Sequence, residues 1–135
     1  MEMHFNLLMI DPGVDERQQE HTDVGEEFEL GSNTKHFHMI GLTVIDKQSF
    51  LYLQPLGMEP IIVLIEKGDT LMMRHGIPHA GAENFTQLKN VRLHFFIDIP
   101  GWNLKLDHGY TIKKFNWDNG PKIVCFPDKF KYTVM

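Results

Sequence analysis

The chain has little of what marks a secreted or membrane protein. Among its 135 residues there is one cysteine, Cys125, which excludes an internal disulfide and is typical of a reducing compartment. The longest apolar run, Ile61 to Ile65, is far too short to cross a bilayer. The apolar stretch near the start follows Glu2 and not a basic segment, so we expect no signal peptide. These absences predict an intracellular protein, cytoplasmic or organellar, with no membrane partner.

An excess of positive charge is also lacking, as is any sign of a second domain. The 13 Lys and Arg residues face 18 Asp and Glu, and the formal net charge of −5 gives no field that would attract phosphate backbones. A nucleic-acid partner is therefore not expected. No repeat or Pro/Gly-rich linker divides the chain, whose length is typical of one domain. We predict one domain over 1–135, with a core of about residues 3–100 and a tail, 101–135, that packs on it.

Helical periodicity is nearly absent. Its one weak candidate is Val14–Glu20, barely two turns long. What recurs instead is short apolar runs separated by Gly, Pro, Asp and Asn, the spacing typical of an all-β sandwich or barrel. The expected strands are Met3–Ile10, His21–Val24, His36–Ile45, Phe50–Gln54, Ile61–Glu66, Thr70–Arg74, Val91–Ile99 and Tyr110–Phe115. The sequence predicts an all-β fold with very little helix, a small β-barrel or jelly roll.

The alternation along the run from Val91 to Asp98 divides its side chains between two faces. Arg92, His94 and Asp98 share one face with Phe96, and the other face is wholly apolar. The polar face is typical of a cavity lining, and the apolar face needs cover that the chain has no sizeable helix to supply. We therefore expect a homo-oligomer or a subunit of a larger complex, unless the turns and the tail fold back over this surface.

Two histidines and one aspartate form the most informative pattern in the chain. His21 and Asp23 are two residues apart in an extended segment, so both side chains point to one side of it. His79 follows much later, in a loop that Gly76, Pro78 and Gly81 shape. If the strand with His79 lies opposite, two nitrogens and one oxygen converge on one point. This ligand set is typical of iron(II) oxygenases, because it leaves three positions open on the ion. The alternative is that His21 and Asp23 only cap a turn.

Three runs, in this order, resemble the second half of an iron(II)/2-oxoglutarate-dependent oxygenase core. They are Glu66-Lys67-Gly68-Asp69-Thr70-Leu71, His79-Ala80-Gly81-Ala82-Glu83-Asn84 and Asn90-Val91-Arg92-Leu93-His94. In the first half, Gln19 precedes His21-Thr22-Asp23 much as in phytanoyl-CoA-hydroxylase-like and prolyl-hydroxylase-like members. The resemblance covers about Met3 to Pro100 and implies a double-stranded β-helix, the jelly-roll barrel that cupins share.

The resemblance also implies cofactors and roles. The metal is Fe(II), held by His21, Asp23 and His79, and the cosubstrate is 2-oxoglutarate. Arg92 binds its far carboxylate, which a guanidinium can do bidentately. Many family members have a serine two residues after the arginine, where this chain has His94, which can donate to the same carboxylate. The activity implied is hydroxylation of an unidentified small-molecule or protein substrate.

Other interpretations stay open. His36-Phe37-His38 is a second i, i+2 pair, and with Gly68, His79 and Asn84 it resembles the two cupin motifs, which would place the metal on His36, His38 and His79. The glutamate expected after that pair is absent, because Ile40 to Thr43 stand there. Arg92 could instead pair with an acid such as Asp98. The chain could also be a non-catalytic β-barrel subunit that retains the motif.

Overall fold

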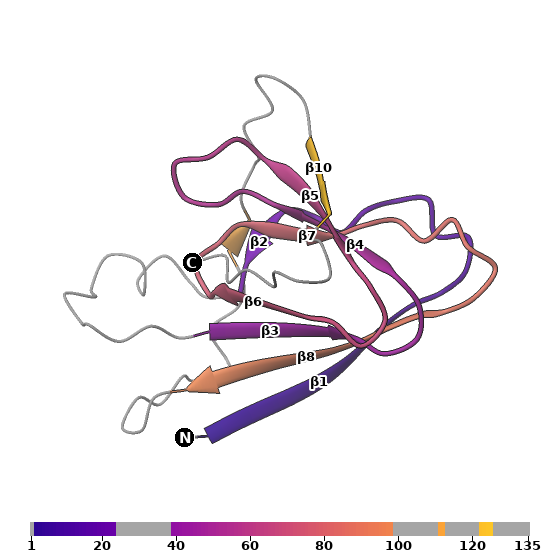
Figure 1. Cartoon of the computed structure of the whole chain (residues 1–135), viewed down its shortest axis with the longest axis horizontal. Coiled ribbons are helices and arrows are strands. Elements are labelled where there is room, and N and C mark those ends of the chain that lie inside the picture. Colours follow the sequence, from indigo (N-terminus) through magenta and orange to yellow (C-terminus); the bar gives the residue numbers. More distant parts are fainter. Residues whose placement is uncertain (1, 24–38, 99–110, 113–121, 126–135) are drawn as a thin grey trace.

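The described part of the chain consists of β-strands in two layers, with no helix (Figure 1). The computed structural model describes residues 2–23, 39–98, 111–112 and 122–125. The strands are β1 (Glu2–Ile10), β2 (His21–Thr22), β3 (Met39–Val44), β4 (Ser49–Leu53), β5 (Ile61–Ile65), β6 (Thr70–Arg74), β7 (His79–Gly81), β8 (Asn90–Asp98), β9 (Thr111–Ile112) and β10 (Lys122–Cys125). Within these residues, no helix suited to crossing a membrane occurs.

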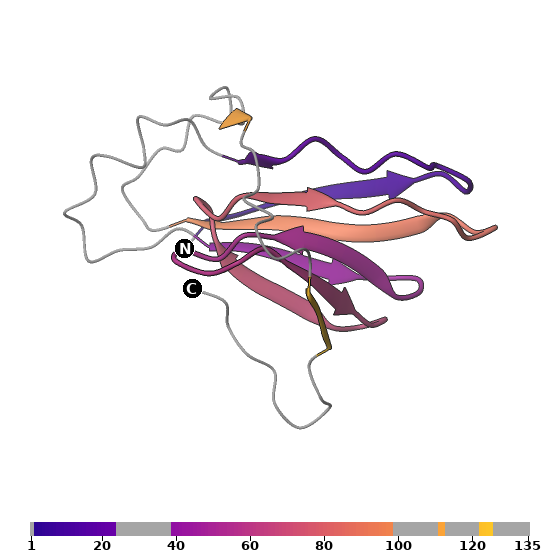
Figure 2. The same ribbon diagram turned by 90° about the horizontal axis from the view of Figure 1, so that it is seen from above.

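Strands that are neighbours in space come from distant parts of the chain. One sheet has the order β1-β8-β3-β6 and the other the order β10-β5-β4-β7-β2-β9. All pairs are antiparallel except β10 with β5. Every consecutive pair of strands except β4 with β5 and β9 with β10 belongs to different sheets, so the chain passes repeatedly from one sheet to the other, and the two sheets lie face to face (Figure 2). This is the double-stranded β-helix, and the predicted fold class is confirmed.

Alternation on the strands divides an apolar core from a polar one. On β4 and β5 every second residue is buried, as the period of a strand requires. The apolar cluster comprises Ile40, Leu42, Val44, Leu51, Leu53, Ile61, Val63, Ile65, Leu71, Met73 and Ile77. Buried polar side chains lie instead mainly on β2, β7 and β8, with His21, Thr22, His79, Arg92 and His94 among them. The inward face of β8 is therefore polar, as its alternation predicts.

The strand predictions are right in the main and wrong in detail. Val14–Glu20 is not a helix: it runs extended, with Val14 bridged to Asn84 and the Gln18 N–H donating to the Gly81 carbonyl over 2.9 Å. These backbone partners, which no local pattern reveals, hold the segment beside β7. β7 and β10 were absent from the predicted strands. β9 and β10 join the six-stranded sheet, whereas the rest of the predicted tail and residues 36–38 lie outside the described residues.

Gly41 on β3 allows an aromatic ring to lie flat on the outer face of the four-stranded sheet. A Cβ at this position would lie 2.0 Å from Cζ of Phe95, its partner on β8. We expect Gly41→Ala to lower the free energy of unfolding by about 1–3 kcal/mol, because the ring must move out of its packed position. Urea denaturation measures this. Gly76→Ala, where nothing lies within 4 Å of the added Cβ, is the matched control. Equal effects of the two substitutions would contradict this account of Gly41.

Candidate metal centre

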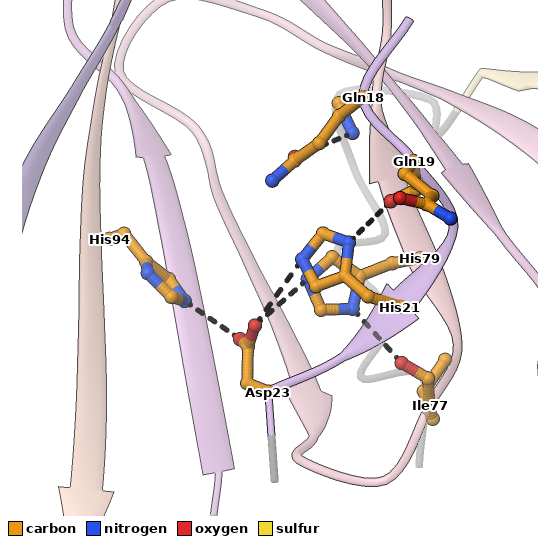
Figure 3. A network of polar contacts seen from close by, with 8 residues as sticks. Gln18, Gln19, His21, Asp23, Ile77, His79 and His94 are labelled. Atoms are coloured by element: carbon orange, nitrogen blue, oxygen red, sulfur yellow. Dashed lines mark hydrogen bonds and ion pairs between the residues drawn. The ribbon is translucent and has the colours of Figure 1, made fainter. Parts of the chain in front are cut away.

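His21 and His79 are brought side by side by the pairing of two short strands. β2 and β7 are antiparallel and place the two residues directly opposite each other. Their ring centroids are 4.5 Å apart, and both side chains are buried. Asp23 follows β2 directly and points between the same two rings (Figure 3). The residues that the sequence places far apart thus meet inside the barrel.

The three side chains offer one ligand atom each toward a common point. Oδ1 of Asp23 is 3.5 Å from Nε2 of His21 and 3.6 Å from Nε2 of His79. All three ligand atoms lie within 4.8 Å of one another. Atoms bound to one ion at about 2.1 Å are roughly 3.0–3.5 Å apart, depending on the angle between the bonds. The two distances from Asp23 to the histidines are therefore within a few tenths of an ångström of this range, and a divalent ion would also draw the two histidine nitrogens together.

The backbone fixes both imidazoles in the orientation that a metal requires. Nδ1 of His21 lies 2.6 Å from the carbonyl oxygen of Gln19, and Nδ1 of His79 lies 3.0 Å from that of Ile77. A carbonyl oxygen only accepts, so each Nδ1 carries the proton and donates. In the neutral ring, Nε2 then keeps a free lone pair that points at Asp23. Such a hydrogen bond on the far nitrogen is what orients a metal-binding histidine.

Burial and the mutual contacts of the cluster decide its charge. Burial lowers the pKa of His79, and the contact with Asp23 does not offset this. Burial also acts to lower the pKa of His21. The hydrogen bond and negative charge of Asp23, with the hydrogen bond to the Gln19 backbone, outweigh this effect, so the pKa of His21 is raised. Burial acts to raise the pKa of Asp23. The hydrogen bonds from His21 and His94 together outweigh it, so the pKa of Asp23 falls well below its ordinary value. The carboxylate is thus ionised and buried, surrounded by imidazoles.

His94 touches Asp23 from the opposite sheet, a contact that the sequence did not predict. Nε2 of His94 is 3.2 Å from Oδ2 of Asp23, the oxygen that faces away from the other two histidines (Figure 3). Both atoms are buried, and neither has a well-directed hydrogen-bond partner among the described residues. Phe96 packs against the His94 ring, with centroids 4.7 Å apart. His94 therefore lies where it can hold the second carboxylate oxygen while Oδ1 stays free for an ion.

We expect substitution of His94 to weaken metal binding without abolishing it. In His94→Phe, Oδ2 of Asp23 loses the imidazole that lies 3.2 Å away and the carboxylate can rotate, so the affinity for Co(II) should fall about 10–100-fold. His94→Gln keeps a donor and should recover part of the loss. Titration of metal-free protein, followed by the visible absorption of Co(II), measures both. His75→Gln, on the loop before β7, is the control. An unchanged affinity in His94→Phe would contradict the contact's role.

Arg92 is buried, and no charged partner for it lies among the described residues. Its side chain is 3% exposed, and its Nε has no hydrogen-bond partner among the described residues. No acidic side chain in the described part of the chain forms an ion pair with it, and burial lowers the pKa of the guanidinium. The side chain of Asp98, its alternative partner, lies outside the described side chains. A buried guanidinium without a counter-charge is costly, which makes Arg92 a candidate anion-binding residue.

A cavity of about 420 Å³ leads to this guanidinium. It is lined by Leu8, Met9, Ile10, Val14, Glu16, Arg17, Gln18, Gly81, Ala82 and Arg92. Nη2 of Arg92 is only 2.8 Å from where a Cβ of Gly81 would be, and Gly81 is two residues beyond His79. Arg92 is likewise two residues from His94 on β8, a step of about 7 Å along the strand. The cavity and the three-residue centre are therefore neighbouring levels of one barrel interior.

Comparisons with known proteins identify the class of fold. No family model matches the chain, and no curated protein does. Solved structures do match. One is a conserved protein with a double-stranded β-helix domain from Klebsiella pneumoniae, with 16% identity, a TM-score of 0.51, and coverage of 83% of this chain and 75% of that one. Another is the Lactobacillus farciminis oxalate decarboxylase formate complex, with 15% identity, a TM-score of 0.53, and coverage of 82% and 26%.

A third match is CENP-C of Drosophila melanogaster bound to CAL1, with 12% identity, a TM-score of 0.51, and coverage of 69% of this chain and 60% of that one. The chain thus spans less than two thirds of this structure and about a quarter of the decarboxylase. Identities this low establish the fold alone. The protein has a cupin-type double-stranded β-helix with a candidate metal centre of His21, Asp23 and His79. The rival ligands His36 and His38 lie outside the described residues.

Proposed function

We propose that the protein is an iron(II)/2-oxoglutarate-dependent dioxygenase that hydroxylates an unidentified substrate. The observation that carries the proposal is the buried guanidinium of Arg92, which has no ion-pair partner among the described residues and lines a cavity one strand step from a two-histidine, one-carboxylate cluster. A cosubstrate for this arrangement needs a chelating end for the ion and an anionic end for the arginine. 2-Oxoglutarate has both, with its 2-oxo acid at one end and a carboxylate at the other.

The donor set suits iron(II). Two neutral imidazoles and one carboxylate give the ion a low charge and leave three coordination positions for a bidentate ligand and dioxygen. When bound, iron(II) supplies the activation of dioxygen, with one oxygen atom passing to succinate as carbon dioxide is lost and the other to the substrate. The chain's own residues do the rest. His21, Asp23 and His79 hold the ion, the Gln19 and Ile77 carbonyls orient the rings, and Arg92 neutralises the distal carboxylate.

Gly81 matters to this proposal because it leaves room for the guanidinium. Any side chain at 81 would meet Arg92 and Oε1 of Gln18, which accepts from the Gly81 N–H over 3.2 Å. The absence of a side chain at Gly81 therefore leaves the two terminal nitrogens of Arg92 the space beside β7 where both residues line the cavity. A buried arginine has fewer conformations open to it, so its planar fork binds a carboxylate at less cost in conformational entropy than a free side chain.

The direct test is turnover of 2-oxoglutarate. Metal-free protein is supplied with iron(II), ascorbate and 2-oxoglutarate in air, and succinate is measured. We expect slow succinate formation even without the proper substrate, and an iron(II)-dependent visible absorption band on adding 2-oxoglutarate without oxygen. The absence of both the band and succinate in protein that binds iron(II) would eliminate the proposal.

A second candidate is a cupin-type metal protein that binds or converts a smaller carboxylate. The match to an oxalate decarboxylase formate complex favours it, because Arg92 could face any small anion. Replacing 2-oxoglutarate by oxalate in the same assay separates the two. Metal binding separates the ligand sets, because Asp23→Ala abolishes it in our proposal, whereas His38→Ala abolishes it in the cupin-type arrangement. A non-catalytic subunit of an assembly would bind neither 2-oxoglutarate nor oxalate, whatever its affinity for metal.

A further inference from the structure

Gln18 is held against β7 by both polar backbone groups of Gly81. Its backbone N–H donates to the Gly81 carbonyl over 2.9 Å, and its side-chain Oε1 accepts from the Gly81 N–H over 3.2 Å. A backbone N–H can only donate, so the atom of the carboxamide that faces it must be the oxygen and not the nitrogen. This hydrogen bond therefore fixes which way the Gln18 side chain is turned.

The fixed orientation leaves the amide nitrogen of Gln18 available to a ligand. Nε2 is on the side of the carboxamide that points away from the Gly81 contact (Figure 3), and it has no acceptor among the residues that the structure describes. Gln18 is exposed and lines the cavity of about 420 Å³, so a molecule that enters the cavity can reach this nitrogen. An amide nitrogen carries two hydrogens that it can donate.

Gln18 and Arg92 are neighbours beside Gly81. A Cβ at Gly81 would lie 3.2 Å from Oε1 of Gln18, and 2.8 and 3.2 Å from Nη2 and Nη1 of Arg92. The carboxamide and the guanidinium thus flank the space that a side chain at this position would fill, and both residues line the same cavity. Since the Gln18 oxygen is held by Gly81, the two side chains have only N–H groups left to offer a ligand.

We propose that Gln18 and Arg92 form one carboxylate site, in which Gln18 makes the site selective for a group that only accepts hydrogen bonds. In identifying this group as the distal carboxylate of 2-oxoglutarate, the inference rests on the proposed function. A carboxylate has about four lone-pair positions, and the two parallel bonds to a guanidinium use two of them. The Gln18 amide donates to a third. A carboxamide or an alcohol at the end of a ligand brings hydrogens of its own and lacks the charge, so the pair disfavours both.

Gln18→Glu tests this role with almost no change of shape. The new side chain keeps an oxygen for the Gly81 N–H, but it replaces the two amide hydrogens by an acceptor and adds a negative charge beside Arg92. In the free protein this charge pairs with the guanidinium, so we expect unfolding at a higher urea concentration than in the wild type. A carboxylate ligand meets the opposite situation, because the added charge repels it and occupies its arginine. The Kd should rise by more than about 30-fold.

Succinate is a suitable probe, because it has two carboxylates but no 2-oxo acid with which to chelate a metal. The metal-free full chain is unfolded in urea with about 1–50 mM succinate at constant ionic strength, and the stabilisation gives the Kd by linkage. Gln18→Met, which removes the donor without adding charge, should raise the Kd by about 10-fold. Gln87→Glu makes the same chemical change as Gln18→Glu on the exposed loop before β8, so it is the control and should bind succinate as the wild type does.

A double-mutant cycle with Arg92 completes the test. In an Arg92→Leu background, Gln18→Glu should no longer stabilise the free protein, because the partner of the added charge is gone. The inference is overturned by a wild type that succinate does not stabilise, by succinate binding that Gln18→Glu leaves unchanged, or by a stabilisation that persists without Arg92. Failure of the proposed function gives a different result: succinate binding depends on both residues as expected, whereas iron(II) with 2-oxoglutarate gives neither the absorption band nor turnover.

Discussion

Replacing His79 by alanine should remove metal binding almost entirely. The side chain is buried, its Nδ1 is held by the Ile77 carbonyl, and its Nε2 is one of the three atoms that face the centre. Without it, an ion keeps one imidazole and one carboxylate. We expect the affinity for iron(II) or Co(II) to fall by more than the 10–100-fold that loss of a supporting hydrogen bond costs, and succinate formation to fall to background. Equilibrium dialysis with metal analysis measures the first effect.

His75→Ala is the matched control for His79→Ala. His75 lies four residues earlier on the same turn but is not among the residues that contact Asp23, so it should leave both affinity and turnover close to the wild type. Circular dichroism should show that both variants keep the β fold, because the apolar core lies mainly on β3, β4 and β5. Equal metal affinity in wild type and His79→Ala would exclude the three-residue centre.

How far the sequence predicts this site depends on the range of each interaction. His21 and Asp23 are two apart in an extended segment, so their common side follows from local geometry. Their approach to His79 does not, because it depends on the register of two strands almost sixty residues apart. The resemblance supplied that pairing, and the register of β2 with β7 agrees with it. β7 itself was missed as a strand because three residues carry no readable periodicity.

The contacts that tune the site were out of reach of the sequence. The alternation of β8 predicted that Arg92 and His94 point inward, but not that His94 would meet Asp23, since this depends on the spacing between the two sheets. The extended path of Gln18 along β7 was not predicted for the same reason, since the sequence offered Val14–Glu20 only as a weak helix candidate. The local alternation of residues thus predicted which face of its strand each side chain is on. Which residue it contacts depends on tertiary packing, which the sequence pattern does not reveal.

The inward face of β8 brings these findings together. Arg92 and His94 are consecutive inward residues, and each places a buried nitrogen at the site: Nε of Arg92, which has no hydrogen-bond partner among the described residues, and Nε2 of His94, which lies 3.2 Å from Oδ2 of Asp23. His94 meets the carboxylate of the metal cluster, and Arg92 lines the cavity beside it. Buried polar atoms without partners cost stability, and they are tolerated mainly where a ligand completes them. The buried polar groups of the site therefore lower the stability of the free protein, and replacing one of them by an apolar side chain should raise the free energy of unfolding.

Replacing Arg92 by leucine should make the free protein more stable while it destroys binding of the cosubstrate. The guanidinium is 3% exposed and has no ion-pair partner among the described residues, so the folded state bears its desolvation cost. Leucine fills part of the same space without charge. We expect the free energy of unfolding in urea to rise by about 1–3 kcal/mol. The Kd for 2-oxoglutarate should rise by about 30-fold to 1,000-fold, since one partner of a buried charge pair is lost.

A rise in the stability of the free protein together with a loss of 2-oxoglutarate binding distinguishes a ligand-binding arginine from a structural one. A structural Arg92 would be paired in the folded state, and Arg92→Leu would then destabilise the protein in the absence of any ligand. Arg92→Lys retains the charge but not the planar fork, so its affinity for 2-oxoglutarate should lie between that of the wild type and that of Arg92→Leu.

Arg17 lines the same cavity but is partly exposed and paired with Glu20 at 2.6 Å, so Arg17→Leu should change stability by less than about 0.5 kcal/mol. Iron(II) affinity should stay unchanged in all three variants, because none of them touches His21, Asp23 or His79. A loss of stability in Arg92→Leu with unchanged 2-oxoglutarate binding would remove the anion site and, with it, the reason to choose 2-oxoglutarate.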